Sequence, residues 1–135
     1  MSTETPNVDM AAYIAQLRKT GDFGALVAAI PYARFLGLSV SVEGGDVITQ
    51  LRAAESLIGN PVLPALHGGT VGALLESAAI FKLLWDVELI AVPKTINITV
   101  DYLRSARVVD TYARATITKH GRRVANVQVR AFQAD

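Results

Sequence analysis

Glu76 lies in the middle of a stretch that is otherwise almost entirely apolar. Of the fifteen residues from 71 to 85, three are polar: Glu76, Ser77 and Lys82. This composition predicts a helix at the centre of the fold. The residues one helical turn from Glu76 cannot pair with a carboxylate; they are Gly72, Ala73, Ala79 and Ile80. Two interpretations are open: Glu76 faces solvent on a thin polar stripe, or an apolar cleft desolvates it and keeps it competent as a base or nucleophile.

The residues before this helix offer a second chemical group. His67, Gly68 and Gly69 stand at its expected start, where backbone N–H groups have no partner within the helix. Glycines place no side chain over these N–H groups, which lie at the positive end of the helix dipole. Such a site attracts the oxyanion that develops when a carbonyl is attacked. His67 itself has two open roles, a hydrogen bond within the site or a structural role at the start of the helix.

The spacing of these groups has a consequence for assembly. Gly69 and Glu76 are seven residues apart, so they share a helix face but are separated by roughly 10 Å along its axis. One subunit cannot easily bring both to the same carbonyl. Two copies that pack these helices antiparallel across a two-fold axis would form two identical composite sites. We therefore expect a homo-oligomer, either a dimer or a pair of dimers.

Composition excludes several other kinds of chemistry. The 135 residues include no cysteine and only two histidines, His67 and His120, which argues against thiolate catalysis and against a zinc site. We expect neither a metal nor a cofactor. The net charge is +1 and the basic residues are scattered, apart from a cluster over residues 119–123. This distribution does not indicate a nucleic-acid partner.

Hydropathy and the first residues of the chain indicate its environment. The first twelve residues lack a basic start and an apolar core, so they do not indicate a secretion signal. Unbroken apolar runs are far shorter than the eighteen or so residues that span a bilayer. We expect a soluble, cytoplasmic protein without a membrane partner.

The elements that must position these groups follow from periodicity. Mixed three- and four-residue spacings predict two short helices over residues 9–30, ended by Pro31. Alternation predicts a hairpin of residues 38–42 and 47–51, a strand over residues 96–102, and a long hairpin of residues 109–119 and 124–132. Residues 53–66 show no periodicity and contain Gly59, Asn60, Pro61 and Pro64, which predicts a loop. The fold class is α+β, a mainly antiparallel sheet packed on one apolar helix.

Four stretches together resemble the hotdog-fold acyl-CoA thioesterases, in the branch like the phenylacetate-pathway thioesterase. They are PYARFLGLSV, HGGTVGALLESAA, TINITVDYLRSA and ATITKHGRRVANVQVRAF. The resemblance covers about residues 31–132. The length of 135 residues indicates a single domain over residues 1–135, with a helical extension over about residues 1–30 that is additional to the family pattern. The resemblance implies a curved sheet wrapped around the helix, dimers whose sheets join edge to edge, and an active site at the subunit interface.

The resemblance also implies roles for individual residues. Glu76 matches the acidic position that attacks the thioester or activates water, and Gly68 matches the residue whose backbone N–H polarises the carbonyl. Asn60 is similar to a loop residue that orients water or the thioester, although it stands seven residues before His67 where six is usual, and a turn-forming role is equally open. Thr95 falls where relatives carry a serine near the reacting centre, or it is simply a residue at the start of a strand.

A further set of residues is similar to positions that meet CoA in the family: Arg104, Lys119, His120, Arg122 and Arg123. Arginine and lysine suit phosphate groups, but a charged hairpin tip is also a common solvated turn. Ile80 stands where the glutamate-bearing aryl-CoA group carries threonine, so aryl specificity is not implied.

The resulting hypothesis is an acyl-CoA thioesterase that releases a free acid and CoA. One alternative is a hotdog-fold acyl-CoA hydratase or dehydratase, but the His-Phe-Pro-Gly type of loop motif of the carrier-protein members does not precede the helix. The other alternative is a non-catalytic module that binds acyl-CoA.

Overall fold

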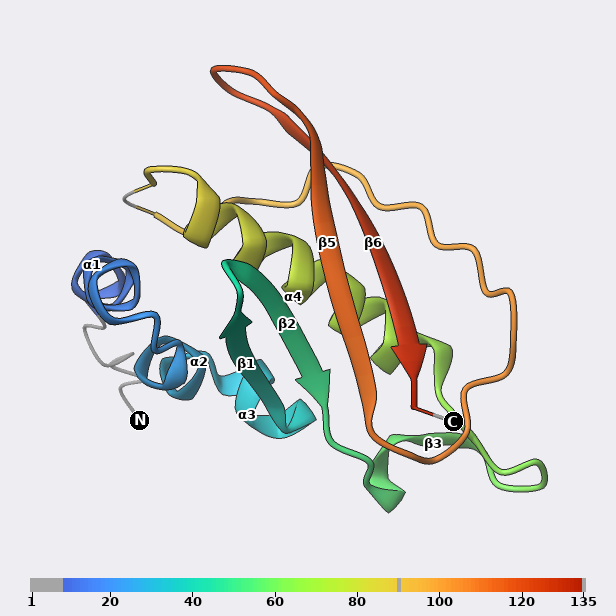
Figure 1. Cartoon of the computed structure of the whole chain (residues 1–135). Helices are drawn as coiled ribbons and strands as arrows, with labels where there is room; N and C mark the ends of the chain where they lie inside the picture. Colours follow the sequence, from blue (N-terminus) through green and yellow to red (C-terminus); the bar gives the residue numbers. More distant parts are fainter. Residues whose placement is uncertain (1–8, 90, 135) are drawn as a thin grey trace, which may run out of the picture.

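The fold is built around one long helix. The computed structural model describes residues 9–89 and 91–134. Helix α4 (Gly68–Asp86) lies against one face of the sheet, as Figure 1 shows. It packs on the sheet through fully buried side chains at three- and four-residue spacing, namely Leu74, Ala78, Phe81 and Leu84. The expected central helix is confirmed and begins at Gly68.

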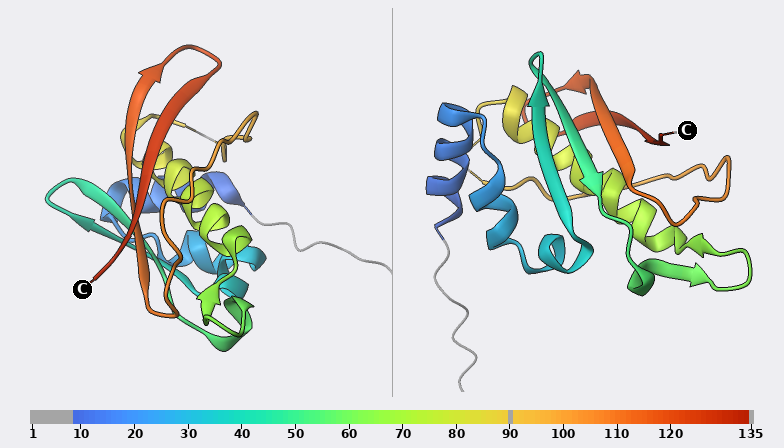
Figure 2. Two further views of the ribbon diagram at one scale, coloured as in Figure 1. Left: turned by 90° about the vertical axis from the view of Figure 1, so that its right-hand side faces the viewer. Right: turned by 60° about the horizontal axis from the view of Figure 1, so that its bottom comes forward.

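The main sheet has four strands in the order β1-β2-β5-β6, and all neighbours are antiparallel. The strands are β1 (Leu38–Glu43), β2 (Asp46–Leu51), β5 (Thr111–His120) and β6 (Ala125–Gln133). Between β1 and β2, Gly44 and Gly45 have φ of 59° and 80°, the left-handed conformation that a two-residue hairpin turn needs. Both predicted hairpins are confirmed, and Figure 2 shows the sheet curving around α4 in the expected α+β hotdog arrangement.

Three short helices precede the sheet, where the sequence predicted two. They are α1 (Met10–Thr20), α2 (Gly24–Ala29) and α3 (Pro31–Leu36). Pro31 does end α2, but it also stands in the first turn of α3, where its missing N–H costs no helical hydrogen bond. Gly37, with φ of 69°, ends that helix.

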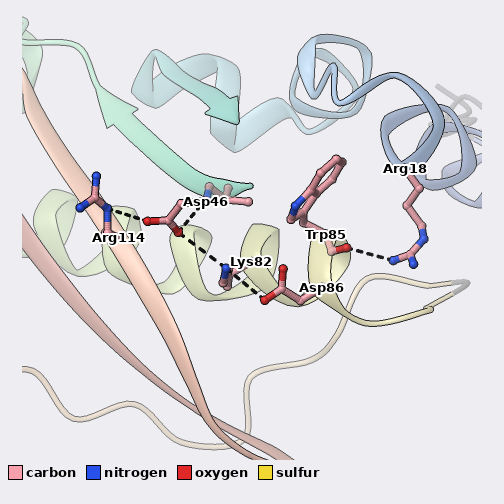
Figure 3. Close-up of polar contacts among 7 residues, drawn as sticks. Arg18, Asp46, Lys82, Trp85, Asp86 and Arg114 are labelled. Atoms are coloured by element: carbon pink, nitrogen blue, oxygen red, sulfur yellow. Dashed lines mark hydrogen bonds and ion pairs between the residues drawn. The ribbon is translucent and has the colours of Figure 1, made fainter. Parts of the chain in front are cut away.

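The N-terminal helices pack on the C-terminal half of α4. The Phe23 ring meets Phe81 edge-on at 5.8 Å between centroids, and Trp85 lies at 6.3 Å. Arg18 of α1 donates hydrogen bonds to the carbonyls of Leu84, Trp85 and Val87 at 3.1, 3.2 and 2.6 Å. This side chain, drawn in Figure 3, thus caps the negative end of the α4 dipole.

A charged network joins the C-terminal half of α4 to strands β2 and β5 of the sheet. Lys82 lies 3.0 Å from Asp86 and 3.6 Å from Asp46, and Asp46 also accepts from Arg114 at 2.9 Å. Figure 3 shows these four side chains together. The cation on α4 is therefore paired with aspartates and not with Glu76.

The segment expected to be a loop contains more structure than its sequence indicated. It forms the 3₁₀ turn η1 (Glu55–Leu57) and two short strands, β3 (Ile58–Asn60) and β4 (Ala65–Leu66), which pair with each other. Gly59 passes so close to the start of α4 that a Cβ on it would lie 2.6 Å from the His67 Cα. The strands are too short for alternation to reveal them.

The prediction of a strand over residues 96–102 is wrong. The backbone there is extended but has no ladder partner among the described residues. Ile96 and Leu103 are 78% and 89% exposed, and Figure 1 shows the segment running past β6 without joining it. Alternation predicts an extended backbone, but a strand also needs a hydrogen-bonding neighbour.

The helices of the described part of the chain are all too short or too polar to cross a membrane.

Candidate active site

The start of α4 is organised by His67. Its side chain accepts a hydrogen bond from the Gly69 N–H at 2.8 Å through Nδ1, and its backbone carbonyl accepts from the Thr70 N–H at 3.0 Å. His67 therefore has the structural role at the helix start that was one of its two expected roles. The expectation that both glycine N–H groups are unpaired is wrong for Gly69, because a histidine side chain can serve as a helix cap.

Gly68 provides the free donor at this helix start. Among the described residues, no hydrogen bond is formed by the Gly68 N–H. It occupies the first position of α4, beside the partial positive charge of the helix dipole. An oxyanion that approaches this end of the helix can therefore be met by a backbone donor with no competing partner.

Tyr102 covers the same end of the helix and was missed by sequence reasoning. Its hydroxyl donates to the Gly68 carbonyl at 2.7 Å. A Cβ on Gly68 would lie 3.4 Å from the tyrosine ring, and one on Gly72 would lie 3.3 Å from its hydroxyl. Gly68 and Gly72 share one helix face and carry no side chains, which leaves room for an aromatic ring to pack there. This spacing of two glycines was the signal available in the sequence.

Glu76 continues the helix face that begins with Gly68 and Gly72. Residues spaced by four share one face, and Leu74 and Ala78, two positions either side of Glu76, are buried against the sheet. Glu76 thus points away from the sheet. It is half-buried, and within the described chain no ion pair or hydrogen bond involves its carboxylate. A partly desolvated carboxylate without a partner can act as a base or a nucleophile.

The two groups are well separated along the helix. Gly68 and Glu76 are eight residues apart, which corresponds to about 12 Å along the axis. Two hollows of the described surface lie elsewhere, one on the outer face of β1, β2, β5 and β6 and the other beside α2 and β1. A single copy therefore presents the two reactive groups on one face without enclosing them.

The loop candidate Asn60 lies at the end of β3. Its Oδ1 accepts from the Val62 N–H at 3.0 Å and from the Leu63 N–H at 3.3 Å, so it forms the turn that was one of its two expected roles. Thr95 is exposed in the extended segment that precedes Tyr102. The structure does not place either residue in contact with Gly68 or Glu76.

The expected CoA-binding residues are divided between two regions. Arg104 follows Tyr102 and is exposed. Lys119, His120, Arg122 and Arg123 are exposed at the tip of the β5–β6 hairpin, which Figure 1 shows at the far end of the molecule from the start of α4. One copy of the chain does not bring these cations to its own Gly68.

Comparison with known proteins gives one consistent result. A family model described as the thioesterase superfamily matches residues 63–135. A crystal structure of a protein from Chromobacterium violaceum is 35% identical, with a TM-score of 0.73 over 92% of this chain and 86% of that chain. A phenylacetic acid degradation-related protein from Ralstonia eutropha JMP134 is 26% identical, with a TM-score of 0.70 over 90% and 89% of the two chains.

A third solved structure adds a ligand. The BH2602 protein from Bacillus halodurans, solved with CoA, is 18% identical and has a TM-score of 0.70 over 97% of this chain and 87% of that chain. Its likeness shows the shared fold. The curated proteins include no match to this chain.

Proposed function

Because the chain belongs to the thioesterase superfamily, we propose that it is an acyl-CoA thioesterase that hydrolyses a thioester to a free acid and CoA. The observation that carries this proposal is the helix face of α4, which starts with the free Gly68 N–H and continues to the unpaired Glu76. A donor for an oxyanion and a carboxylate for attack are the two groups that ester hydrolysis needs. A related fold with CoA bound, in the Bacillus halodurans protein, supports this class of substrate.

The roles of the two groups follow from their chemistry. The thioester carbonyl oxygen accepts a hydrogen bond from the Gly68 N–H, which stabilises the negative charge that develops on it. Glu76 either takes a proton from the attacking water or attacks the carbonyl carbon itself, in which case water then hydrolyses the anhydride. In both routes the C–S bond breaks, the CoA sulfur gains a proton and the acid is released.

We place each site between two copies of the chain. The axial separation of about 12 Å between Gly68 and Glu76 is too large for one substrate carbonyl, whereas an antiparallel pair of α4 helices brings Gly68 of one copy to Glu76 of the other. The extended segment 95–103 supports such a pairing, because it exposes Ile96, Ile98 and Leu103 and has no ladder partner within the described chain. An exposed, apolar, unpaired edge is a surface that another copy can cover.

The same arrangement gives the remaining candidates their roles. An antiparallel pair also brings the hairpin tip of one copy towards the helix start of the other, where Lys119, Arg122 and Arg123 would meet the CoA phosphates. Arg104 would assist from the segment after Tyr102. Asn60 uses its oxygen in a turn, so its amide nitrogen would be the group that orients water, and Thr95 and Gly69 would line the acyl path.

The test is CoA release from a panel of short, medium and aryl acyl-CoAs. Glu76→Gln keeps the size of the side chain and removes its charge, so we expect kcat to fall by at least about 100-fold. Glu88→Gln, an exposed glutamate beyond α4, is the matched control and should retain full activity. Full activity of Glu76→Gln would remove Glu76 from the mechanism, and a wild-type protein that binds CoA esters without turnover would be a binding module.

A further inference from the structure

Tyr102 joins the extended segment to the first turn of α4. Its hydroxyl lies 2.7 Å from the Gly68 carbonyl oxygen, and its ring packs directly on the glycine. A side chain at Gly72 would crowd the hydroxyl, since a Cβ there would lie 3.3 Å from it. Gly72 therefore leaves room for the tyrosine hydroxyl to reach the first turn of the helix.

The Tyr102 hydroxyl and the His67 side chain each make a hydrogen bond to the peptide group between Gly68 and Gly69. The Gly68 carbonyl and the Gly69 N–H belong to the same planar peptide. Tyr102 donates to its oxygen, and His67 Nδ1 accepts from its nitrogen at 2.8 Å. Rotation of this peptide would break at least one of the two hydrogen bonds.

The peptide before it carries the free donor. Its nitrogen is the Gly68 N–H, and its carbonyl, on His67, accepts from the Thr70 N–H at 3.0 Å and from the Thr70 hydroxyl at 2.7 Å. The free N–H thus lies between two restrained groups. A donor that is aimed before the reaction costs no reorganisation when the oxyanion forms.

We infer that Tyr102 is a positioning residue that fixes the Gly68–Gly69 peptide and thereby aims the Gly68 N–H at the thioester carbonyl. This inference rests on the proposed thioesterase function. Tyr102 does not touch the reacting atoms itself. Its hydroxyl acts through the orientation of one backbone donor, so its loss lowers the rate of the chemical step more than it lowers substrate affinity.

The test is Tyr102→Phe, which removes the hydroxyl and keeps the ring on the glycines. Tyr112→Phe is the matched control, because Tyr112 lies on β5 and stacks on Phe132 at 5.7 Å, away from α4's first turn. We expect Tyr102→Phe to lower kcat about five- to tenfold, the effect of one hydrogen bond, with little change in KM or in the unfolding midpoint. The amide resonances of Gly68 and Gly69 should shift in Tyr102→Phe and stay in place in Tyr112→Phe.

The outcomes separate this inference from the function on which it rests. A wild-type protein without turnover overturns both. An active wild type with unchanged kcat and unchanged Gly68 and Gly69 resonances in Tyr102→Phe overturns the positioning role alone. A raised KM or a lower midpoint with unchanged kcat also overturns it, because it assigns Tyr102 to binding or to stability.

Discussion

The smallest unit of the proposed chemistry is one backbone N–H. Gly68 stands at the first position of α4, and proline is tolerated there because its missing N–H costs no helical hydrogen bond. Gly68→Pro therefore removes the donor and leaves the helix in place. We expect kcat to fall by about 100- to 1,000-fold, the effect of losing one oxyanion donor.

Gly68→Ala is the control for this change. It keeps the N–H and adds a Cβ at 3.4 Å from the Tyr102 ring, which is an ordinary van der Waals contact. It should keep most of the activity in the same CoA-release assay. Equal activity of the proline and alanine variants would show that the Gly68 N–H takes no part in the reaction.

Single residues were predictable where their role depends on local sequence. The helix start at His67 to Gly69 and the unusual position of Glu76 follow from the sequence alone. The use of the Gly69 N–H by His67 Nδ1 depends on the rotamer of one side chain. The Tyr102 hydrogen bond joins residues 34 positions apart, and periodicity carries no information on such a contact.

At the scale of elements, α4 depends on another helix for its C-terminal end. The last turn of α4 contains no basic residue, and Arg18 of α1 supplies the cation and three hydrogen bonds instead. Arg18→Ala should lower the free energy of unfolding by about 1–2 kcal/mol. Chemical denaturation measures this loss.

Lys19→Ala provides the comparison, because Lys19 is the next residue of α1 and is exposed. It should leave the free energy of unfolding nearly unchanged. If Arg18→Ala were as stable as Lys19→Ala, the Arg18 contacts would not stabilise the end of α4.

Helices and strands were predictable where the pattern of apolar and polar residues within the element is enough to specify it. The two hairpins have strong alternation and α4 has an almost entirely apolar composition within their own residues, and the structure confirms all three. Helix α3 was missed because Pro31 was taken only as a stop, although proline also begins helices. The strand predicted over residues 96–102 was wrong, because a strand depends on a pairing neighbour that its own sequence cannot specify.

At the scale of the whole molecule, the proposed site needs two copies of the chain. Each copy presents one donor and one carboxylate on a single helix face, about 12 Å apart. A pair of copies would contain two sites, each with Gly68 from one subunit and Glu76 from the other. A site formed by two subunits is the central claim. It predicts that two inactive variants restore activity when they are mixed, whereas a site within one subunit does not.

The most direct test mixes two inactive variants, Gly68→Pro and Glu76→Gln. After joint unfolding and refolding, a mixed dimer contains one site with both defects and one site with none. An equal mixture should therefore recover about a quarter of the wild-type activity, because half of the dimers are mixed and each has one intact site. A mixture that stays as inactive as its two components, with mixed dimers confirmed by mass spectrometry, would contradict the shared site and place Gly68 and Glu76 in the same subunit's reaction.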